Sequence, residues 1–440
     1  MKRYSLLVIF IGLFVSNSFI CKNNSFFCSL YKRKTEEKKE KKVKPFDIDV
    51  SGYVKLDSFF DTRQIVGQKA GIFFQFPANE LLDVTGVDSN DQPQFNQGAT
   101  ESLVHLDITG PKVGEANSFA VIETDFIVGS GSLLDSTIGA VQLRHAYMNF
   151  DWTKTTIMLG HSVHPLSPAI LLPNRISYNY EGVYAPRVYV PQARLYRSSN
   201  KFDMLFAICS HYKNQSSKQA IIPNLYFQCN RKFDQDVAIG AGIDFRAEKP
   251  RLVTLNNYKT SKSINSIVAH CFGIFYTDYS AIKLRFAYAE NAQQYDMLGG
   301  FGIINVDAVT EERTYANLRS LNVTTEIMRE TSNYEIGFFL GFAKNIGAKL
   351  SSSETILTTA AATVPTGLGT TFDTTDNTTK GIDNMVTISP RIRWKFDPAV
   401  FGIEMDYTRA KYGTMNNKGK VKNTKAVDNC RVQFAAYYYF

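Results

Sequence analysis

The sequence predicts an all-β fold: a transmembrane antiparallel β-barrel of about sixteen strands, with short periplasmic turns and long extracellular loops. Three observations lead to this fold class. Apolar and polar residues alternate through many segments, the connections between these segments are alternately short and long, and residues 430–440 form an aromatic strand. Each of these features is typical of a closed barrel whose outer face contacts lipid and whose inner face is wet.

Residues 430–440 carry the clearest alternation. One face at period two is apolar or aromatic and comprises Val432, Phe434, Ala436, Tyr438 and Phe440. A soluble protein seldom exposes such a run, because the resulting patch invites aggregation. In a membrane barrel the same residues face lipid and the interfacial aromatic girdle. A final strand ending in Phe also resembles the sorting signal of bacterial outer-membrane barrels.

Residues 1–18 have the pattern of a secretory signal peptide. Lys2 and Arg3 form a charged head, a short apolar core follows, and residues 16–18 provide a small-x-small cleavage site. A membrane anchor is the alternative, but the apolar run is shorter than the ~20 residues that a span requires. Lipid modification of Cys21 is disfavoured because Ile20 precedes it. No later stretch has the length and apolarity of a membrane helix, so strands are expected to do the spanning.

The formal charge of +8 lies in the N-terminal part of the chain. The run 32–44 holds eight basic and three acidic residues, and Lys2, Arg3 and Lys22 supply the remainder, so residues 45–440 are neutral. A nucleic-acid-binding body would not be neutral, so no nucleic-acid partner is expected. We interpret residues 19–45 as a basic periplasmic tether and 46–440 as the barrel. The alternative for the basic run is an arm that contacts peptidoglycan or anionic lipid.

Cysteines and histidines give no metal or cofactor pattern. The six cysteines lack CxxC spacing, and no pairing follows from their positions. Four of them are expected to be buried strand residues: Cys209, Cys229, Cys271 and Cys430. His161 and His164 lie three apart, which suits a metal pair or ordinary loop chemistry, and we expect the latter. We therefore predict no metal and no cofactor.

Period-two segments follow one another from residue 46 onward. In 47–59, for example, Val54 and Leu56 lie on one face while Lys55 and Asp57 lie on the other. The segments expected to be strands are 47–59, 102–109, 117–127, 140–150, 154–161, 191–199, 202–210, 221–230, 236–246, 264–276, 281–289, 333–342, a weak one at 345–352, 388–396, 400–407 and 430–440. Their even number is typical of bacterial barrels.

The connections between these segments alternate in length. The long ones are expected near 60–101, 128–139, 162–190, 211–220, 247–263, 291–331, 353–384 and 411–429. With both termini periplasmic, all of them lie outside the cell, which agrees with the barrel fold. A soluble sandwich has no reason to place a long loop at every second connection. The Thr-rich stretch 355–379 then belongs to an outer loop.

Four stretches resemble the DcaP-like outer-membrane porins, in the same order along the chain. They are residues 52–64 (GYVKLDSFFDTRQ), 122–126 (IETDF), 143–147 (LRHAY), and 159–163 (LGHSV) with 191–196 (PQARLY). The resemblance implies a trimeric diffusion porin whose third outer loop folds into the lumen. Two features depart from the family: Gly160-His161-Ser162-Val163 replaces a common Gly-Gln-Thr-Trp, and the helical N-terminal arm of some members is at most a short charged run. These departures bear on substrate preference and on trimer contacts.

The same region of the chain is the candidate constriction. Loop 162–190 contains four prolines that stiffen it, and it carries Arg175 and Arg187. The full set of predicted pore-lining residues is Arg63, Arg144, Arg175, Arg187, Arg194, Arg197, Asp57, Asp61, Glu123 and Asp125. Opposed lumen charges create a transverse field, and clustered guanidinium groups favour carboxylate or phosphate solutes. The alternative is that these side chains pair with one another to hold the loop.

The sequence therefore predicts a passive outer-membrane channel for small hydrophilic solutes, with anions favoured at the neck. Its expected partners are outer-membrane lipid and two further copies of itself in a homotrimer. Two other functions stay open: a plugged barrel that acts in surface binding or adhesion, and a barrel-embedded hydrolase. For the hydrolase, Ser102 with His105 is the nearest pair, and no GxSxG motif is present. We predict that the protein is not an enzyme.

Overall fold

The computed structural model is a closed antiparallel β-barrel with sixteen strands in its wall. It describes residues 46–68, 71–127, 140–179, 181–210, 220, 222–233, 236–357, 366–367, 369–373 and 378–440. The predicted signal peptide and tether, the outer loop at 128–139, and Cys21 and Cys28 lie outside the described residues. Within the described parts, no helix is long and apolar enough to cross a membrane.

Wall strands account for most of the described chain. They are β1 (Asp47–Asp61), β5 (Leu103–Thr109), β6 (Asn117–Ile127), β7 (Ala140–Trp152), β8 (Thr155–Val163), β9 (Tyr189–Ser198), β10 (Phe202–Cys209), β11 (Asn224–Lys232), β12 (Val237–Glu248), β13 (Ile264–Tyr276), β14 (Ser280–Glu290), β16 (Arg313–Glu330), β17 (Tyr334–Ala348), β20 (Thr378–Phe396), β21 (Ala399–Met415) and β22 (Val421–Tyr439). Short strands in the connections are β2 (Ile65–Gln68), β3 (Phe73–Pro77), β4 (Gln94–Gly98), β15 (Gly300–Val306), β18 (Thr366–Gly367) and β19 (Thr371–Asp373). Short 3₁₀ turns are η2 (Ala169–Leu171), η3 (Gly182–Tyr184) and η4 (Ala292–Tyr295).

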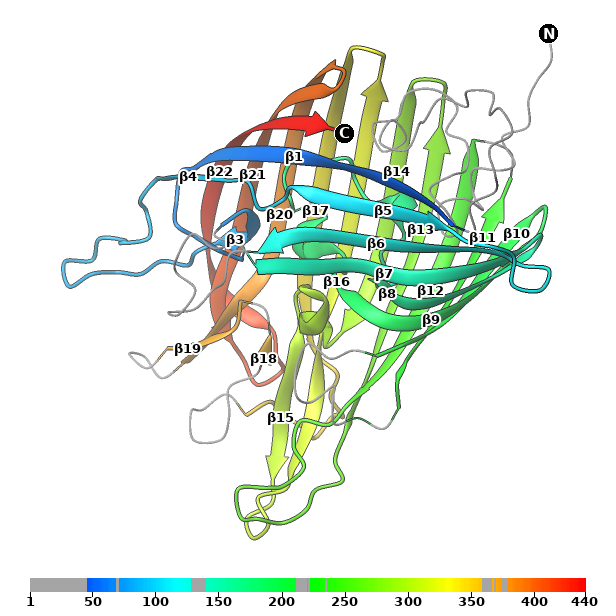
Figure 1. Ribbon diagram of the computed structural model, residues 1–440. Helices are drawn as coiled ribbons and strands as arrows, with labels where there is room; N and C mark the ends of the chain where they lie inside the picture. The colour runs from blue at the N-terminus through cyan, green and yellow to red at the C-terminus, as the bar shows by residue number, and fades with distance from the viewer. Residues whose placement is uncertain are drawn as a thin grey trace, which may run out of the picture.

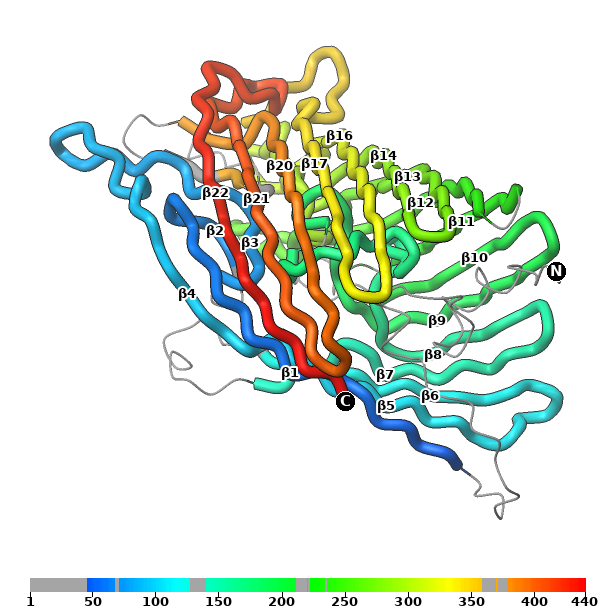
Figure 2. Tube along the Cα trace, turned by 90° about the horizontal axis from the view of Figure 1, so that it is seen from above, coloured from blue at the N-terminus to red at the C-terminus, as the bar shows by residue number. Residues whose placement is uncertain are grey.

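The barrel closes where its first and last strands meet. Each wall strand pairs with the next one along the chain, and β22 pairs with β1, with Tyr439 opposite Tyr53 and Arg431 opposite Asp61. The other edge of β1 pairs with β5. Figure 2 shows β22 and β1 side by side, and Figure 1 shows the wall around the interior. Closure leaves no unpaired edge, as a barrel in lipid requires.

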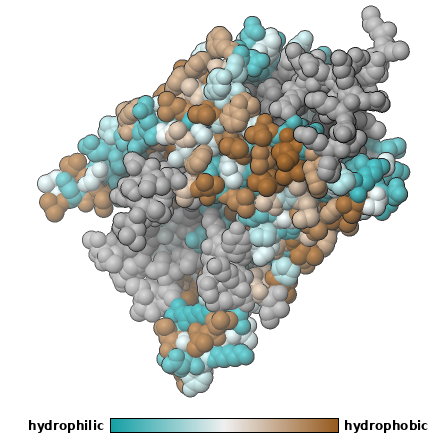
Figure 3. All heavy atoms as spheres, viewed as in Figure 1, coloured by the Kyte–Doolittle hydropathy of each residue, from teal (hydrophilic) through white to brown (hydrophobic). Residues whose placement is uncertain are grey.

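The two faces of the wall follow the predicted alternation. Outward side chains such as Ile239, Phe286 and Phe434 are 46%, 53% and 40% exposed, although they are apolar. Inward side chains such as Lys55 and Arg431 are fully buried. Figure 3 shows hydrophobic side chains gathered over the wall and hydrophilic ones toward its edges. Such an arrangement is stable when lipid, and not water, surrounds the wall.

The predicted strand number is right, but two strands were placed incorrectly. The prediction left β16 inside a long loop at 291–331, and it divided β17 into segments at 333–342 and 345–352. In β16, Thr325 shares the outward face with Leu321 and Ile327, which weakens the alternation. In β17 the outward face changes from Phe342 to Lys344 while the strand continues. Both errors arise where a strand is partly polar on the face that was expected to be apolar.

The last outer connection is shorter than predicted. Strands β21 and β22 extend to Met415 and Val421, so residues 416–420 connect them in place of the predicted loop 411–429. A strand that extends beyond the lipid no longer needs apolar outward residues, so its pattern fades while its pairing persists. The prediction of buried cysteines is also wrong for Cys271, which is exposed; Cys209 is buried, and Cys229 and Cys430 are half-buried.

Two outer connections are joined through Glu311. Its carboxylate accepts hydrogen bonds of 2.6 Å from Arg251, in the connection after β12, and from Arg313 at the start of β16. Slight burial raises the pKa of Glu311, but the bonds from Arg313 and Arg251 outweigh it and lower the pKa to about 2. We expect the joint to be intact above the ordinary glutamate range and to loosen only as pH falls toward 2. Glu311→Gln should therefore speed deuterium exchange in residues 249–263 at neutral pH; unchanged exchange would contradict this role.

Candidate functional site

Residues 164–188, which we call the inward loop, connect β8 to β9 and lie inside the barrel. Nearly all of its described residues are buried, including Leu166, Ile176, Ser177 and Tyr184. Turns η2 and η3 and four prolines limit its conformational freedom. The loop crosses toward the wall formed by β14, β16, β17, β20, β21, β22 and β1, which we call the far wall.

Glu404 of β21 is the central anchor of the inward loop. Its carboxylate accepts hydrogen bonds from the backbone N–H of Ile176 at 2.6 Å, the hydroxyl of Ser177 at 2.6 Å and Nε of Arg175 at 3.0 Å. Arg175 also pairs with Asp406, two residues further along β21. All of these side chains are buried. The predicted pore residue Arg175 therefore holds the loop to the wall, as the structural alternative for it proposed.

Further contacts fasten the loop on both sides of Glu404. The backbone N–H of Asn174 donates to Glu326 at 2.6 Å, and the ammonium of Lys55 donates to the carbonyl of Ile176 at 2.7 Å. Arg393 donates to the carbonyl of Arg175 at 2.5 Å. Because these partners lie on β16, β1 and β20, the loop is attached across a broad part of the far wall.

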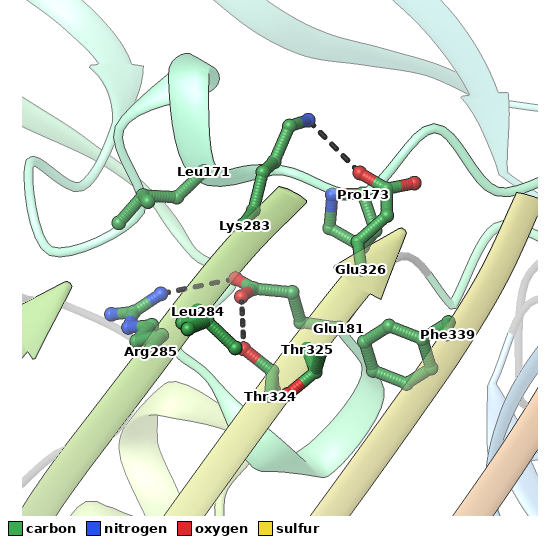
Figure 4. Close-up of a pocket in the computed structure, with 10 residues that line it drawn as sticks. All are labelled: Leu171, Pro173, Glu181, Lys283, Leu284, Arg285, Thr324, Thr325, Glu326 and Phe339. Carbon is green, nitrogen blue, oxygen red and sulfur yellow. Dashed lines mark hydrogen bonds and ion pairs between the residues drawn. The ribbon is translucent and has the colours of Figure 1, made fainter. Parts of the chain in front are cut away.

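A small cavity separates the loop from β14, β16 and β17 (Figure 4). Glu181 of the loop accepts hydrogen bonds from Arg285 at 3.0 Å and from Thr324 at 3.1 Å. Lys283 and Glu326 form a second ion pair at 3.0 Å. Each charge at this cavity therefore faces an opposite one.

The far wall holds a buried charge network that sequence reasoning did not assign to the site. Arg391 pairs with Glu326 at 2.5 Å and with Glu335 at 3.1 Å, and Arg393 pairs with Glu335 at 3.3 Å. In the predicted strand 388–396, Arg391 and Arg393 alternate with Ile392 and Trp394, a pattern that indicates an inward face for the two arginines. The prediction did not include the neighbouring strand β16, whose Glu326 completes the network.

A second segment of the chain also enters the barrel. Residues 71–77, which include β3, are almost wholly buried, with Phe73, Phe74 and Phe76 at 4%, 3% and 4% exposure. The backbone N–H of Phe74 donates to Asn179 of the inward loop at 2.8 Å, and the ring of Phe73 packs edge-on against Tyr178. Sequence reasoning placed this segment in an outer loop. The run Ile72-Phe73-Phe74 was the available signal, because an outer loop has no reason to be so apolar.

The predicted residues of β6 and β7 meet on the opposite side of the interior, which we call the near wall (β5 to β9). Nε of Arg144 lies 3.0 Å from Glu123, and its Nη1 lies 3.7 Å from Asp125. Arg144 also donates to the hydroxyl of Tyr189 at 3.2 Å. His105 lies 2.9 Å from the other oxygen of Glu123. This group combines both signs of charge.

Arg194 and Arg197 lie on the same strand but on different faces. Arg194 is buried and donates to Gln192 at 2.6 Å and to the carbonyl of Val163. Arg197 is exposed and shares the outward face of β9 with Leu195. The prediction that Arg197 lines the pore is therefore wrong, because the three-residue spacing from Arg194 reverses the side of a strand.

The remaining predicted residues are distributed around the seam and the outer loops. Asp57 pairs with Lys55 at 2.9 Å, and Asp61 pairs with Arg431 at 2.8 Å across the β1–β22 seam. Arg63 lies just beyond β1 and pairs with Asp88 in the outer connection at 2.6 Å. In the inward loop, the guanidinium of Arg187 lies 3.8 Å from the ring centre of Tyr178.

In the described residues, neither the histidine pair His161 and His164 nor the pair Ser102 and His105 is assembled into a site. No group of three or more His, Cys, Asp or Glu side chains in that part of the chain is arranged to hold a metal ion. His164 faces Asp244 at 3.6 Å, while His161 stacks on Tyr189. The Ser102 hydroxyl bonds to the backbone of Lys55, whereas the His105 ring faces Glu123.

Solved outer-membrane barrels share this fold. The chain is similar to the outer-membrane channel DcaP of Acinetobacter baumannii (TM-score 0.62, 15% identity, covering 90% of this chain and 97% of that one). It is also similar to an anion-selective porin from Comamonas acidovorans (TM-score 0.53, 8% identity, covering 90% and 100%) and to the outer-membrane protein OmpT of Vibrio cholerae (TM-score 0.51, 11% identity, covering 91% and 99%). No protein-family model and no curated protein sequence matches the chain. The fold is thus that of the porins, and the likeness to DcaP that the sequence motifs suggested is confirmed at the level of fold.

Proposed function

We propose that the protein is an outer-membrane porin, a passive channel for small hydrophilic solutes. The observation that carries this proposal is the inward loop, which narrows the interior: Glu404, Glu326 and Lys55 of the far wall anchor its residues 174–177, and its Ile170 and Leu171 pack in a buried cluster with residues of β13. A loop held to one side narrows a barrel and leaves a passage along the other side. The similarity in fold to a channel and to an anion-selective porin supports the same class.

The passage is proposed to follow the near wall. Asp107 of β5 and His145 of β7 retain side-chain exposures of 35% and 20%, whereas Glu404 and Glu335 on the far wall retain none. Polar side chains that water reaches inside a barrel are the expected lining of an aqueous path. No turnover chemistry is part of this function.

Anion preference is the finer part of the proposal. Arg175 and Arg63 are matched by Glu404 and Asp88, so they contribute little net field. Arg194 instead donates to two neutral groups, Gln192 and the Val163 carbonyl. Its charge adds to the group of Arg144, Glu123 and Asp125 on the same near wall, and we propose that these two guanidinium groups favour carboxylate or phosphate solutes in the passage.

Reversal potentials in a salt gradient test this preference. The double variant Arg144→Ala/Arg194→Ala should lower the anion-to-cation permeability ratio severalfold, because the substitutions remove two fixed positive charges from a confined path. Arg197→Ala is the matched control, since it removes a guanidinium from the outward face of the same strand and should leave the ratio unchanged. An unchanged ratio in the double variant would refute the proposal that Arg144 and Arg194 favour anions in the passage.

A barrel closed to solutes and active in surface binding is the second candidate. One observation favours it: the inward loop and residues 71–77 together fill the interior, with Phe73, Ile176 and Tyr184 almost completely buried. Planar-bilayer recordings separate the two functions. Stepwise conductance from the pure refolded protein supports the porin, whereas repeated insertion without steps supports the closed barrel.

Assembly and location follow from the same proposal. We expect export through residues 1–18, insertion into the bacterial outer membrane and association into a homotrimer. Vibrio cholerae OmpT, which shares the fold, is described in a trimer form. Cross-linking of the protein in isolated outer membranes tests the assembly, and a band pattern ending at the monomer would count against it.

A further inference from the structure

Two connections form a projecting tip at the outer end of the barrel. One is the connection between β12 and β13, at residues 249–263, and the other is the turn at 307–312 between β15 and β16. Together we call them the tip. Figure 1 shows β15 and the start of β16 reaching beyond the rest of the wall, with residues 249–263 beside them. Leu321 is the last exposed apolar residue toward the outer end of β16, and Arg313 lies eight residues further, so the tip lies roughly 25 Å along the strand from the lipid-facing band.

Hydrogen bonds fix the two connections of the tip against each other. The side-chain amide of Asn256 donates to the carbonyl of Val309 at 2.8 Å, and the hydroxyl of Thr260 donates to Glu312 at 3.0 Å. Glu311 joins the same two connections, as described above. The tip is therefore held in one conformation, and its side chains form a defined surface.

Apolar side chains of the tip are exposed in spite of this order. Leu255 and Val309 are 72% and 71% exposed, and Leu252, Val253 and Tyr258 are exposed as well. Leu255 lies beside Val309, because its backbone N–H bonds to Glu311 and the next residue bonds to the Val309 carbonyl. Figure 3 shows hydrophobic side chains among hydrophilic ones at this projecting end. Apolar side chains so far from the surrounding lipid gain free energy when another apolar phase covers them.

The charge around these apolar side chains is positive, although residues 45–440 are neutral as a whole. Residues 249–263 contain no acidic residue and four basic ones, Lys249, Arg251, Lys259 and Lys262. Residues 307–313 contain three acidic residues and one arginine, so the two segments together carry a formal charge of +2. Lys259 and Lys262 are exposed and make no ion pair with any described residue.

Another outer connection has the same apolar exposure with the opposite charge. Leu81 and Leu82 are 59% and 58% exposed, but residues 79–92 contain four acidic residues and no basic one. Exposed leucines are thus common to both connections, whereas basic surroundings distinguish the tip. A partner that is both apolar and anionic would select the tip over residues 79–92.

We propose that the tip inserts into an anionic lipid bilayer apposed to the outer face of the cell. Leu255 and Val309 enter the interface of that bilayer, and Lys259 and Lys262 contact its headgroups, a combination by which peripheral segments bind anionic membranes. A bilayer covers a convex apolar surface without a complementary pocket, whereas a standard protein complex takes ~20–30 residues from each partner. The proposal rests on the outer-membrane location proposed above and is independent of conduction through the barrel.

Quenching of a tryptophan in the tip tests the proposal. The full-length chain carrying Tyr258→Trp is placed in phosphatidylcholine nanodiscs, and vesicles of phosphatidylglycerol and phosphatidylcholine with brominated acyl chains are added. Bromine quenches tryptophan only at close range within the bilayer. The signal of the chain without Tyr258→Trp is subtracted, so the basic run at 32–44 cannot produce the result. We expect quenching that saturates with vesicle concentration, and an absence of quenching would overturn the insertion.

Variants of the apolar side chains give the matched comparison. In the Tyr258→Trp chain, Leu255→Ser/Val309→Ser should weaken vesicle binding at least about tenfold, because two apolar side chains no longer leave water. Leu81→Ser/Leu82→Ser makes the same kind of change in the acidic connection and should leave binding unchanged. Equal affinity of these two variants would show that the tip does not bind the vesicle.

The lysines identify the ligand. Lys259→Gln/Lys262→Gln should weaken binding to the anionic vesicles at least about tenfold, since each surface cation contributes about fivefold, and should change binding to phosphatidylcholine vesicles little. An equal loss on both vesicles would overturn the role of anionic headgroups. Nanodiscs that associate with one another, while added vesicles cause no quenching, would assign the tip to a second copy and overturn the lipid. Conductance of Leu255→Ser/Val309→Ser should equal that of the wild type, so failure of the channel and failure of the tip give different results.

Discussion

Glu404→Ala should release the inward loop and produce a larger and noisier conductance than the wild type. The substitution removes the acceptor for Ile176, Ser177 and Arg175 at once, and the buried Arg175 guanidinium loses the Glu404 carboxylate as an ion partner. Breaking a buried charge pair in this way costs ~3–5 kcal/mol. Single-channel recording measures the conductance, and thermal unfolding followed by circular dichroism measures the loss of stability.

The control for this prediction is Arg409→Ala. It breaks an ion pair with Asp428 on the neighbouring strand, but that pair is exposed on the outward face of the wall. It should change neither conductance nor stability by a measurable amount, because exposed pairs contribute ~0–1 kcal/mol. If Glu404→Ala left open-channel noise and mean conductance at the wild-type level, the loop would not be the element that sets the passage.

Phe73→Ser/Phe74→Ser/Phe76→Ser should open the interior more than any single change in the wall. These rings are buried against the inward loop and the seam, where Arg431 lies 5.2 Å from the ring centre of Phe74. Truncating a buried phenylalanine costs ~3–5 kcal/mol of packing, so the segment should leave the barrel. Liposome swelling with sugars of increasing size measures the result as a higher size limit.

Leu81→Ser/Leu82→Ser is the matched control, because it alters the same outer connection at side chains that are 59% and 58% exposed. It should leave the size limit unchanged. A triple variant that folds, inserts and keeps the wild-type limit would show that residues 71–77 do not obstruct the path. If the wild type showed no conductance and the triple variant conducted, the result would favour a closed barrel whose interior is blocked by residues 71–77.

The fold could be predicted from the sequence because each wall strand places apolar side chains toward lipid and polar side chains toward the interior. Ile403 must face lipid and Glu404 must not, so the period-two pattern reports the face directly. The pattern fails in two cases. In β17 the environment changes along the strand, so that the outward residue Lys344 is charged, and in β16 the outward residue Thr325 is polar. The prediction missed β16 for that reason, and the correct strand number depended on dividing β17.

The site was less accessible because its partners are far apart in the chain. Arg175 and Glu404 are separated by 229 positions, and no local pattern indicates that they meet. The charged, inward position of each was predictable, but the pairing was not. Arg194 and Arg197 differ in a simpler way: they are three positions apart along β9, so they lie on opposite faces of the strand and only Arg194 points inward.

The wall strands differ greatly in length, and this gives the rim an uneven height. Strands β9 and β10 have 10 and 8 residues, whereas β20 and β22 have 19 each. At ~3.3 Å per residue the tall side rises roughly 30 Å further along the strand direction than the low side. Among the described residues, the strand wall is consequently taller on the side of β20 and β22 than on the side of β9 and β10.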